Sequence, residues 1–346
     1  FDQRDAAEML RDIWSLFVPR WAPYLEMLLI LAEGENDAEA LNKGLAQLGM
    51  ARNFQPVDLP EAGPFAERAP RTGLPACGIS HGEFVDAGLA RKRQFSISPG
   101  DGSERRFAGE ETGLKQALVF PRNLSPADVS EDEPWGLDFP FEGEDRRLAV
   151  IHADGNGLGQ VLHALSGLAG NYPEATARLY LGFSQALERA TESAAQGAYR
   201  ETLKPAAVGE NPARIPARPL ILGGDDLTLI IRADLALAFA ASFTRHFEEA
   251  SRRELSAWRM SESLAQFCAA LPTALTLCTG IAYISANQPF SMAAHLAETL
   301  CQHAKQTGQA VLEKGIGGSA NRPKPSALAF HRVTTSLVDD DQLDAP

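Results

Sequence analysis

The sequence has few cysteines and no excess of positive charge. Its 346 residues include 4 Cys, and no two of these form a C-x-x-C pair, so we expect neither a disulfide framework nor a structural zinc site. Buried free thiols in a reducing cytoplasm are the expected state of these cysteines. Lys and Arg number 32 against 45 Asp and Glu. The net charge of -13 argues against broad non-specific binding of nucleic acid, while a local basic groove stays compatible with it.

Long apolar runs are also missing. No run reaches the roughly 18 residues of a membrane span, and no signal peptide is recognisable, so we expect a cytoplasmic protein with no membrane partner. The dipeptide His-Asp does not occur, so nothing indicates a metal phosphohydrolase of the HD type. Hydrophobic residues make up 45% of the chain, which is enough for one large domain or two smaller ones.

The sequence changes in character near residue 147. Residues 1–147 are predicted to be an N-terminal helical and irregular region, with helix mostly before residue 50. A Gly-rich polar stretch (98–113) and an acidic, linker-like stretch (125–147) are predicted to be loops with small elements. Residues 148–346 alternate between apolar, β-rich segments and amphipathic segments, and they are predicted to form a second domain.

The second domain has a recognisable order of elements. It begins with a strand, a Gly-rich turn and a helix, and a long helix and a hairpin follow. A helix with an apolar stripe, a β-branched strand, a helix ending at Gly308 and a terminal strand complete it. The order is β-α-β-β-α-β with one helical position doubled. We therefore predict an α+β, ferredoxin-like palm of the kind that many nucleotide polymerases and cyclases share.

The hairpin PLILGGDDLTLII, residues 219–231, carries two adjacent carboxylates. Gly-Gly is a natural hairpin turn, but Asp225 and Asp226 at its exit repel each other unless a cation lies there. In this fold the first strand lies beside the hairpin, and Asp154 ends that strand. Three carboxylates would then meet at one edge of the sheet. This donor set suits Mg²⁺ or Mn²⁺, and two such ions can activate a hydroxyl for in-line attack on an α-phosphorus.

Strand geometry refines this expectation. Side chains alternate along a strand, so Asp225 and Asp226 should point to different sides unless the turn distorts them, and we favour Asp225 as the ligand of both metals. We expect the carboxyl oxygens of Asp154 and Asp225 to lie roughly 3–5 Å apart, because such ligands sit about 2.0–2.6 Å from the metal. The alternative is an exposed acidic turn without a metal.

Glycines near these acids predict a phosphate site. Gly155, Asn156, Gly157 and Gly159 lead into a helix whose first N–H groups could hold phosphate oxygens. The alternative there is an Asx-type turn. Further nucleotide contacts are predicted from Gly223, Gly224 and Lys305.

Glycine at residues 223 and 224 lets a nucleotide approach the backbone. Lys305 lies late in the next helix, where its charge could reach the β- and γ-phosphates or be a solvated surface charge. We expect three of the histidines to be isolated structural or exposed residues, namely His81, His152 and His163.

These residues together resemble a known family. HADGNGLG, LILGGDDLTLII, LTLCTGIAYI with a following PF, the helix ending in AK, and SALAFH resemble the second palm domain of the polymerase-like large subunit of type III CRISPR effector complexes. The resemblance covers about residues 148–338. The palm is similar, more distantly, to the GGDEF domain of diguanylate cyclases.

The resemblance implies an activity and a set of site residues. In the family, the palm converts ATP into cyclic or linear oligoadenylates when foreign RNA is bound. It implies metal ligands at Asp154, Gly155, Asp225 and Asp226, with phosphate contacts from Lys305. It also implies two Mg²⁺ or Mn²⁺ ions, ATP as substrate, and either an RNA-containing effector complex or a homodimer as partner.

Alternatives remain open at this level. A non-catalytic palm that acts as a nucleotide sensor or scaffold is one, and a diguanylate-cyclase-like enzyme that uses GTP is another, although the turn reads GGDD. The sequence begins with Phe1 rather than Met, which indicates a fragment. A first palm is then either degenerate within residues 1–147 or upstream of Phe1.

Overall fold

The computed structural model places secondary structure in both halves of the chain. It describes residues 36–51, 67–70, 74–80, 82–90, 102–109, 118–121, 139–141, 146–171, 176–210, 213–261, 272–313 and 324–334. The helix predicted before residue 36 lies outside these ranges, and so do His81 and Cys268. None of the helices described is long and apolar enough to cross a bilayer.

The chain divides into two compact units. The first comprises residues 1–99 with 169–177, and the second, here called the sheet unit, comprises residues 100–168 with 178–346. The first unit contains helix α2 (Asp37–Ala51), which agrees with the helix predicted there, and a hairpin of β1 (Gly78–Ser80) with β2 (Glu83–Val85).

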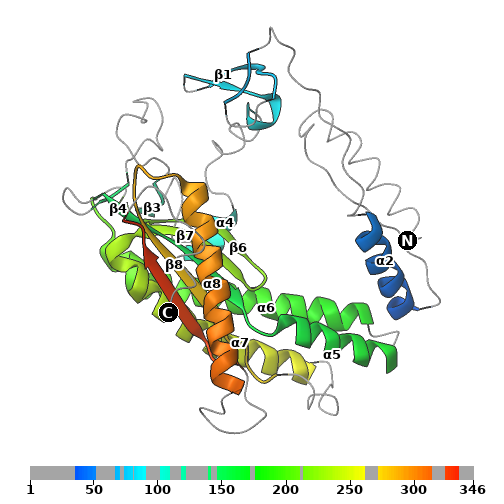
Figure 1. The fold of residues 1–346 in the computed structure, drawn as a ribbon. Helices are drawn as coiled ribbons and strands as arrows, with labels where there is room; N and C mark the ends of the chain where they lie inside the picture. The colour runs from blue at the N-terminus through cyan, green and yellow to red at the C-terminus, as the bar shows by residue number, and fades with distance from the viewer. Residues whose placement is uncertain are drawn as a thin grey trace. The chain divides into compact units, whose positions relative to one another are not determined.

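The sheet unit contains the other elements described, except that the end of one of its helices and the start of the next, within residues 169–177, belong to the first unit (Figure 1). Its strands are β3 (Leu118–Val119), β4 (Arg147–Gly155), β5 (Ala213–Arg214), β6 (Ala217–Gly223), β7 (Asp226–Arg232), β8 (Leu277–Ser285) and β9 (Ala327–Arg332). Its α-helices are α4 (Gly102–Ala108), α5 (Leu158–Asn171), α6 (Thr176–Ala198), α7 (Ala236–Ser261) and α8 (Phe290–Glu313). Short helical turns lie at Tyr199–Leu203, Lys204–Ala206 and Ala233–Leu235.

The main sheet has the strand order β6-β7-β4-β8-β9. The pairs β6–β7, β7–β4 and β4–β8 are antiparallel, whereas β8 and β9 are parallel. The elements β4, α5 with α6, β6, β7, α7 and β8 therefore form the predicted ferredoxin-like unit. The helix α8 and the strand β9 extend it by one parallel crossover, which adds a strand at the β8 edge.

Helices cover both faces of the central strands. Alternate residues of β4 point to opposite faces, and Leu148, Ala149, Val150 and Ile151 are all buried. Helix α8 covers one face, as Figure 1 shows. A Cβ built on Gly280 of β8 would lie 1.9 Å from the carbonyl oxygen of Ala297 in α8, so this close packing requires glycine.

Tertiary packing overrides some local signals, so the predicted helix end at Gly308 and the predicted burial of Cys77 were wrong. The Gly-rich stretch contains helix α4, one of the small elements predicted there, and its Phe107 is fully buried and stacks on Phe239 with ring centroids 5.8 Å apart. Helix α8 continues past Gly308 to Glu313, because Gly308 keeps an ordinary helical φ and contacts the segment at Pro325. Burial of the cysteines holds for Cys278 and Cys301, but Cys77 is exposed.

We predict that Gly280→Ala lowers the free energy of unfolding by about 3 kcal/mol or more. The added methyl group meets backbone atoms of α8 rather than a flexible side chain, so the helix must move away from the sheet. Urea denaturation monitored by circular dichroism measures the change. Gly167→Ala in α5 is the matched control, because its Cβ would meet nothing within 4 Å. Equal stability of the two variants would contradict the packing described.

Candidate active site

The register of β4 on β7 brings two of the predicted carboxylates to the same place. Ala153 lies opposite Leu227, and His152 lies opposite Thr228. One step further along this register, Asp154 lies opposite Asp226. Directly opposed residues point to the same face of an antiparallel pair. Asp154 and Asp226 therefore share the sheet face on which α8 packs.

The third carboxylate reaches this site from the turn. Gly223 pairs with Asp226, so the two-residue loop is Gly224–Asp225 and not the predicted Gly-Gly pair. Gly224 has φ +60°, as the first position of a type I′ or II′ turn requires. Asp225 thus lies outside the strand, and strand alternation does not separate it from Asp226. Its carboxyl group is hydrogen-bonded to that of Asp154.

Glycine at residue 155 permits this approach. A Cβ on Gly155 would lie 2.8 Å from the Cβ of Asp225 and 2.7 Å from Leu158 Cδ1. Both distances are shorter than side chains tolerate, so any other residue would push the turn away from β4. The structure gives Gly155 this packing function beside the carboxylates.

Burial and neighbouring carboxylates raise the pKa of Asp225 and of Asp226 and so disfavour their ionisation. Burial, and after it the charge of Asp154, raises the pKa of Asp225 from 3.8 to about 6. Burial also raises the pKa of Asp226, and the neighbouring His152 and Lys305 oppose this rise. The site therefore holds more negative charge than its protein surroundings balance. A bound cation would relieve that imbalance.

Lys305 is one cation that the protein itself supplies. Its ammonium group extends from α8 and donates a hydrogen bond to Asp154 Oδ2. The predicted lysine therefore does lie at the carboxylates rather than on a remote surface, since only 28% of its side chain is exposed. Contact of this lysine with phosphates stays a prediction.

The sequence did not indicate that His152 and Thr228 lie beside the carboxylates. His152 Nδ1 lies 3.2 Å from Thr228 Oγ1 and 3.6 Å from Asp226 Oδ1, so His152 is not the isolated residue that was expected. The available signal was its spacing, because a residue two positions before Asp154 on a strand shares its face. His163 is exposed, as expected.

One side chain of the Gly-rich loop, that of Asn156, is turned into the protein. The side chain of Asn156 is buried, and its amide donates to Thr276 Oγ1 at 3.1 Å while its backbone N–H donates to the carbonyl of Thr276 at 2.8 Å. Asn156 therefore orders the loop, and its contact with a phosphate stays a prediction. Gly157 has φ +78°, and the helix that follows begins at Leu158, so Gly157 and Gly159 remain at a helix N-terminus as predicted.

A buried hydroxyl holds the turn in place. Thr191 of α6 is fully buried, and its Oγ1 lies 2.5 Å from the carbonyl oxygen of Gly224 and 3.1 Å from that of Leu187. The turn that carries Asp225 is thereby tied to the helix beneath it. Gly223 and Gly224 have nothing within 4 Å of a Cβ position, so the outer side of the turn is open to a ligand.

The residues fit a hard divalent cation. Asp226 Oδ1 is buried and has no hydrogen-bond partner among the described residues, which is the state of an oxygen placed for a metal. Within those ranges, no three His, Cys, Asp or Glu side chains enclose one ion position by themselves. Mg²⁺ does not need such a cage, because it commonly binds one or two carboxylates together with substrate phosphates and water.

We predict that Thr191→Val destabilises the protein by about 1 kcal/mol, since the carbonyl of Gly224 loses its donor while the shape of the side chain is kept. Chemical denaturation measures this loss. Thr191→Ser keeps the hydroxyl and is the control. A larger loss in the serine variant than in the valine variant would show that packing, and not the hydrogen bond, holds the turn.

We predict a pH-dependent effect of Asp225→Asn in the presence of EDTA. Because the pKa of Asp225 is higher in the folded protein than its ordinary 3.8, the folded state binds this proton more tightly than the unfolded state does. The stability contributed by protonated Asp225 is present below pH 4 and is lost as pH rises to about 6. The variant should therefore gain stability relative to wild type across this window. A pH-independent difference between the two would contradict the carboxylate cluster.

The part of the chain that carries the carboxylates matches a known family model. Residues 147–311 match the family model described as Cas10/Cmr2, second palm domain. This range includes β4, the hairpin and most of α8, and so it contains Asp154, Asp225, Asp226 and Lys305. No curated protein sequence matches the chain.

Several solved structures are distantly similar to this chain. The Csm1-Csm4 cassette in complex with pppApA is 18% identical, with a TM-score of 0.34 over 55% of this chain and 26% of that chain. The same cassette in complex with cA3 is 17% identical, with a TM-score of 0.32 over 47% of this chain and 20% of that one. The active GGEEF domain of a diguanylate cyclase from Vibrio cholerae is 8% identical, with a TM-score of 0.29 over 54% of this chain and 85% of that domain. The present chain thus spans about a quarter or less of the Csm1-Csm4 chains that it matches. Residues 147–311, a little under half of this chain, thus resemble the Cas10/Cmr2 second palm domain.

Proposed function

We propose that the sheet unit is a metal-dependent nucleotidyltransferase that converts ATP into cyclic or linear oligoadenylates, second messengers in prokaryotic antiviral defence. The convergence of Asp154, Asp225 and Asp226 at one sheet end, inside a segment that resembles the Cas10/Cmr2 palm, carries this proposal. A non-catalytic sensor has less need for three carboxylates that repel one another, so their convergence supports catalysis.

The reaction is a phosphoryl transfer. The 3′-hydroxyl of one nucleotide loses its proton to solvent, and its oxygen forms a bond to the α-phosphorus of another nucleotide. The bond from that phosphorus to the bridging oxygen breaks, and pyrophosphate leaves with the displaced electron pair. Mg²⁺ or Mn²⁺, held by Asp154, Asp225 and Asp226, would supply charge neutralisation and activation of the hydroxyl.

The chain's own groups orient the reactants. The two-residue turn and Gly155 keep the carboxylates together, and Thr191 fixes the turn from below. Lys305 holds Asp154 and balances part of its charge, and its ammonium group would meet a triphosphate held through a metal ion at the same carboxylate. The open outer side of Gly223 and Gly224 leaves room for the backbone to approach a ligand.

Selection of the base requires groups beyond these. The carboxylates, the Gly155–Gly159 loop and Lys305 would hold metal and phosphate, which ATP and GTP share. A pocket for the base would come from other residues of the chain, from a second copy of the chain or from an RNA-containing effector complex. The second copy and the effector complex are the partners that we propose.

We predict that the double variant Asp225→Asn with Asp226→Asn abolishes nucleotide conversion while the protein stays folded. Loss of the metal ligands removes several kcal/mol of transition-state stabilisation, so turnover should fall by at least 10³-fold, about 4 kcal/mol. Incubation with ATP and Mg²⁺ or Mn²⁺, with products resolved by mass, is the measurement. Glu249→Gln, which removes a carboxylate from the exposed surface of α7, is the control and should keep full activity. Undiminished turnover in the double variant would make the acids structural.

We predict that ATP is preferred over GTP. A mismatched hydrogen bond at a buried base pocket costs about 1–3 kcal/mol, which corresponds to roughly 5- to 150-fold in affinity. Competition binding at equal metal concentration measures this preference. Preferred turnover of GTP would favour a diguanylate-cyclase-like enzyme, whereas tight binding without turnover in any assembly would favour a nucleotide sensor.

A further inference from the structure

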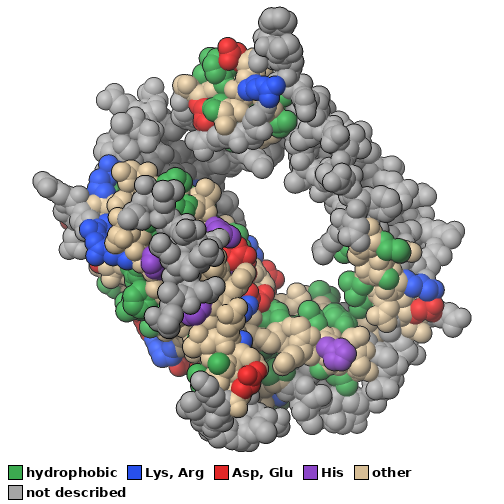
Figure 2. Space-filling view, viewed as in Figure 1, with side chains coloured by type: hydrophobic (Ala, Val, Ile, Leu, Met, Phe, Trp, Pro, Cys, Tyr) green, Lys and Arg blue, Asp and Glu red, His purple; other side chains and the backbone are tan. Residues whose placement is uncertain are grey.

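The hydrogen bond from Lys305 to Asp154 uses an oxygen that a metal ion would also use. Lys305 donates to Asp154 Oδ2, and the same carboxyl group is hydrogen-bonded to that of Asp225. Figure 2 shows Asp and Glu side chains gathered beside α8, near the tip of the β6–β7 hairpin. The ammonium group of Lys305 is thus a cation that the chain itself places against these acids.

A divalent ion at Asp154 would lie very near this ammonium group. Metal ions lie about 2.0–2.6 Å from a carboxylate oxygen, and charge-assisted N–H···O bonds are about 2.7–2.9 Å long. An ion on either oxygen of Asp154 would therefore lie within a few ångströms of the lysine nitrogen. The two side chains are only 28% and 37% exposed, so solvent screens part of the resulting repulsion and leaves the rest. Lys305 and a metal ion therefore compete for Asp154.

The backbone beneath Lys305 is fixed, whereas its side chain can move. Cys301 and Ala304 are buried on the sheet side of α8, and Gly308, one turn further on, is buried beside Pro325. A lysine carries a compact charge on a flexible four-carbon stem. Its ammonium group can therefore leave Asp154 by rotation of the side chain, without any movement of α8.

The charge of Lys305 also acts on Asp226. Burial raises the pKa of Asp226, and the charges of His152 and Lys305 oppose that rise. Asp226 Oδ1 is buried without a hydrogen-bond partner among the described residues. A metal ion that takes over both carboxylates would release the ammonium group to another anion.

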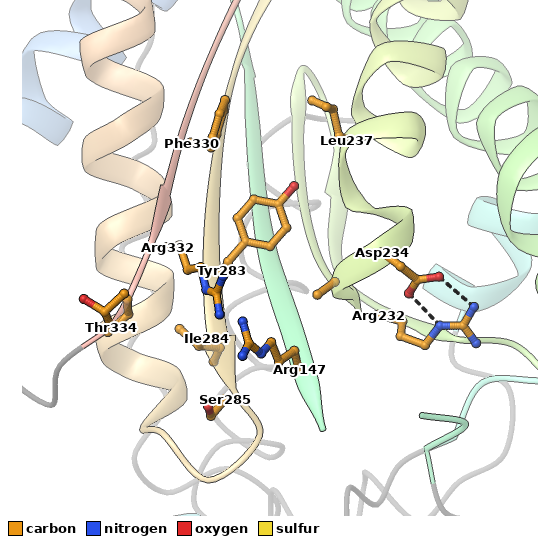
Figure 3. A pocket seen from close by; sticks show the side chains of 12 residues that line it. Arg147, Arg232, Asp234, Leu237, Tyr283, Ile284, Ser285, Phe330, Arg332 and Thr334 are labelled. Atoms are coloured by element: carbon orange, nitrogen blue, oxygen red, sulfur yellow. Dashed lines mark hydrogen bonds and ion pairs between the residues drawn. The ribbon is translucent and has the colours of Figure 1, made fainter. Parts of the chain in front are cut away.

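That anion has to arrive at the carboxylate end of the sheet. An arginine-lined cavity of about 690 Å³ lies at the other end, where Arg147 begins β4 and Ser285 ends β8 (Figure 3). Asp154 lies seven positions after Arg147 on β4, which at about 3.3 Å per residue is roughly 23 Å away. An anion in that cavity is out of reach of Lys305, whereas the phosphates of a nucleotide held at the carboxylates are within reach.

We propose that Lys305 is a built-in competitor of the metal ion, whose ammonium group holds Asp154 until the phosphates of an incoming nucleotide draw it away. The phosphate half of this inference rests on the proposed function, and the competition at Asp154 does not. Lys305 then has two opposite effects. It weakens divalent-ion binding when no nucleotide is present, and it strengthens nucleotide binding once a metal ion is on the carboxylates. Metal and nucleotide thereby bind cooperatively.

The first test is Mn²⁺ binding to the full chain without nucleotide, followed by the electron paramagnetic resonance signal of free Mn²⁺. Lys305→Met removes the charge and keeps a long side chain, so it should bind Mn²⁺ about tenfold or more tightly than wild type. Lys305→Arg keeps a charge and should bind as wild type does. Lys43→Met, in the exposed ion pair with Glu39 on α2, changes the net charge equally and should also bind as wild type does.

A combined variant locates the gain in Mn²⁺ affinity. Adding Asp225→Asn and Asp226→Asn to Lys305→Met should abolish the gain, because the ion then lacks its carboxylate ligands. A gain that persists in the combined variant would place the ion elsewhere on this acidic protein and overturn the inference.

The second test is binding of an ATP analogue with a methylene group between the α- and β-phosphates, measured by calorimetry at saturating Mn²⁺. The methylene group prevents release of pyrophosphate, so affinity is measured without turnover. Lys305→Met should bind the analogue about tenfold more weakly than wild type. A merely structural ion pair would not change the two affinities in opposite directions.

Circular dichroism checks the folding of each variant, and Lys305→Gln replaces Lys305→Met if the latter does not fold. The inference is overturned if both uncharged variants unfold, if Mn²⁺ affinity equals that of wild type, or if both affinities change in the same direction. Catalysis is assessed separately. A wild-type protein that shows the exchange but converts no nucleotide contradicts only the proposed function.

Discussion

Repulsion among three carboxylates is the interaction on which the rest of this structure depends. The antiparallel register of β4 on β7 sets Asp154 opposite Asp226, and the two-residue turn adds Asp225. Burial intensifies the repulsion, as the raised pKa of Asp225 shows. An arrangement that opposes its own stability persists only where the scaffold holds it firmly. A bound cation would relieve that repulsion.

The scaffold holds the acids through close backbone contacts. Gly155 lets the turn reach β4, and Gly280 lets α8 pack tightly on β8. Close packing of α8 in turn places Lys305 at Asp154. On the opposite side of the sheet, Thr191 ties the turn to α6. Two glycines, one lysine and one threonine from different elements thus support the same group of carboxylates.

The two ends of the sheet differ in charge. Carboxylates gather where β4 ends and β7 begins, and arginines gather where β4 begins and β9 ends. The ferredoxin-like topology produces this separation, because antiparallel neighbours bring the start of one strand beside the end of the next.

The sequence by itself determined the order of elements and the convergence of the acids. Periodicity and turn residues predict β4, the hairpin and α7, and the ferredoxin-like topology follows from that order. Asp154 and the Gly-Gly-Asp-Asp hairpin then have to meet, because topology alone makes their strands neighbours.

Only the tertiary structure decided the local details. Asn156 faces inward because Thr276, distant in sequence, offers it partners, and His152 joins the site because β7 places Thr228 beside it. Helix α4 forms in a Gly-rich stretch because Phe107 finds a buried aromatic partner. The arginine-lined cavity draws its residues from four strands and one helix, and no pattern along the chain indicates such a cluster. These features depend on contacts between distant segments, and periodicity contains no information about such contacts.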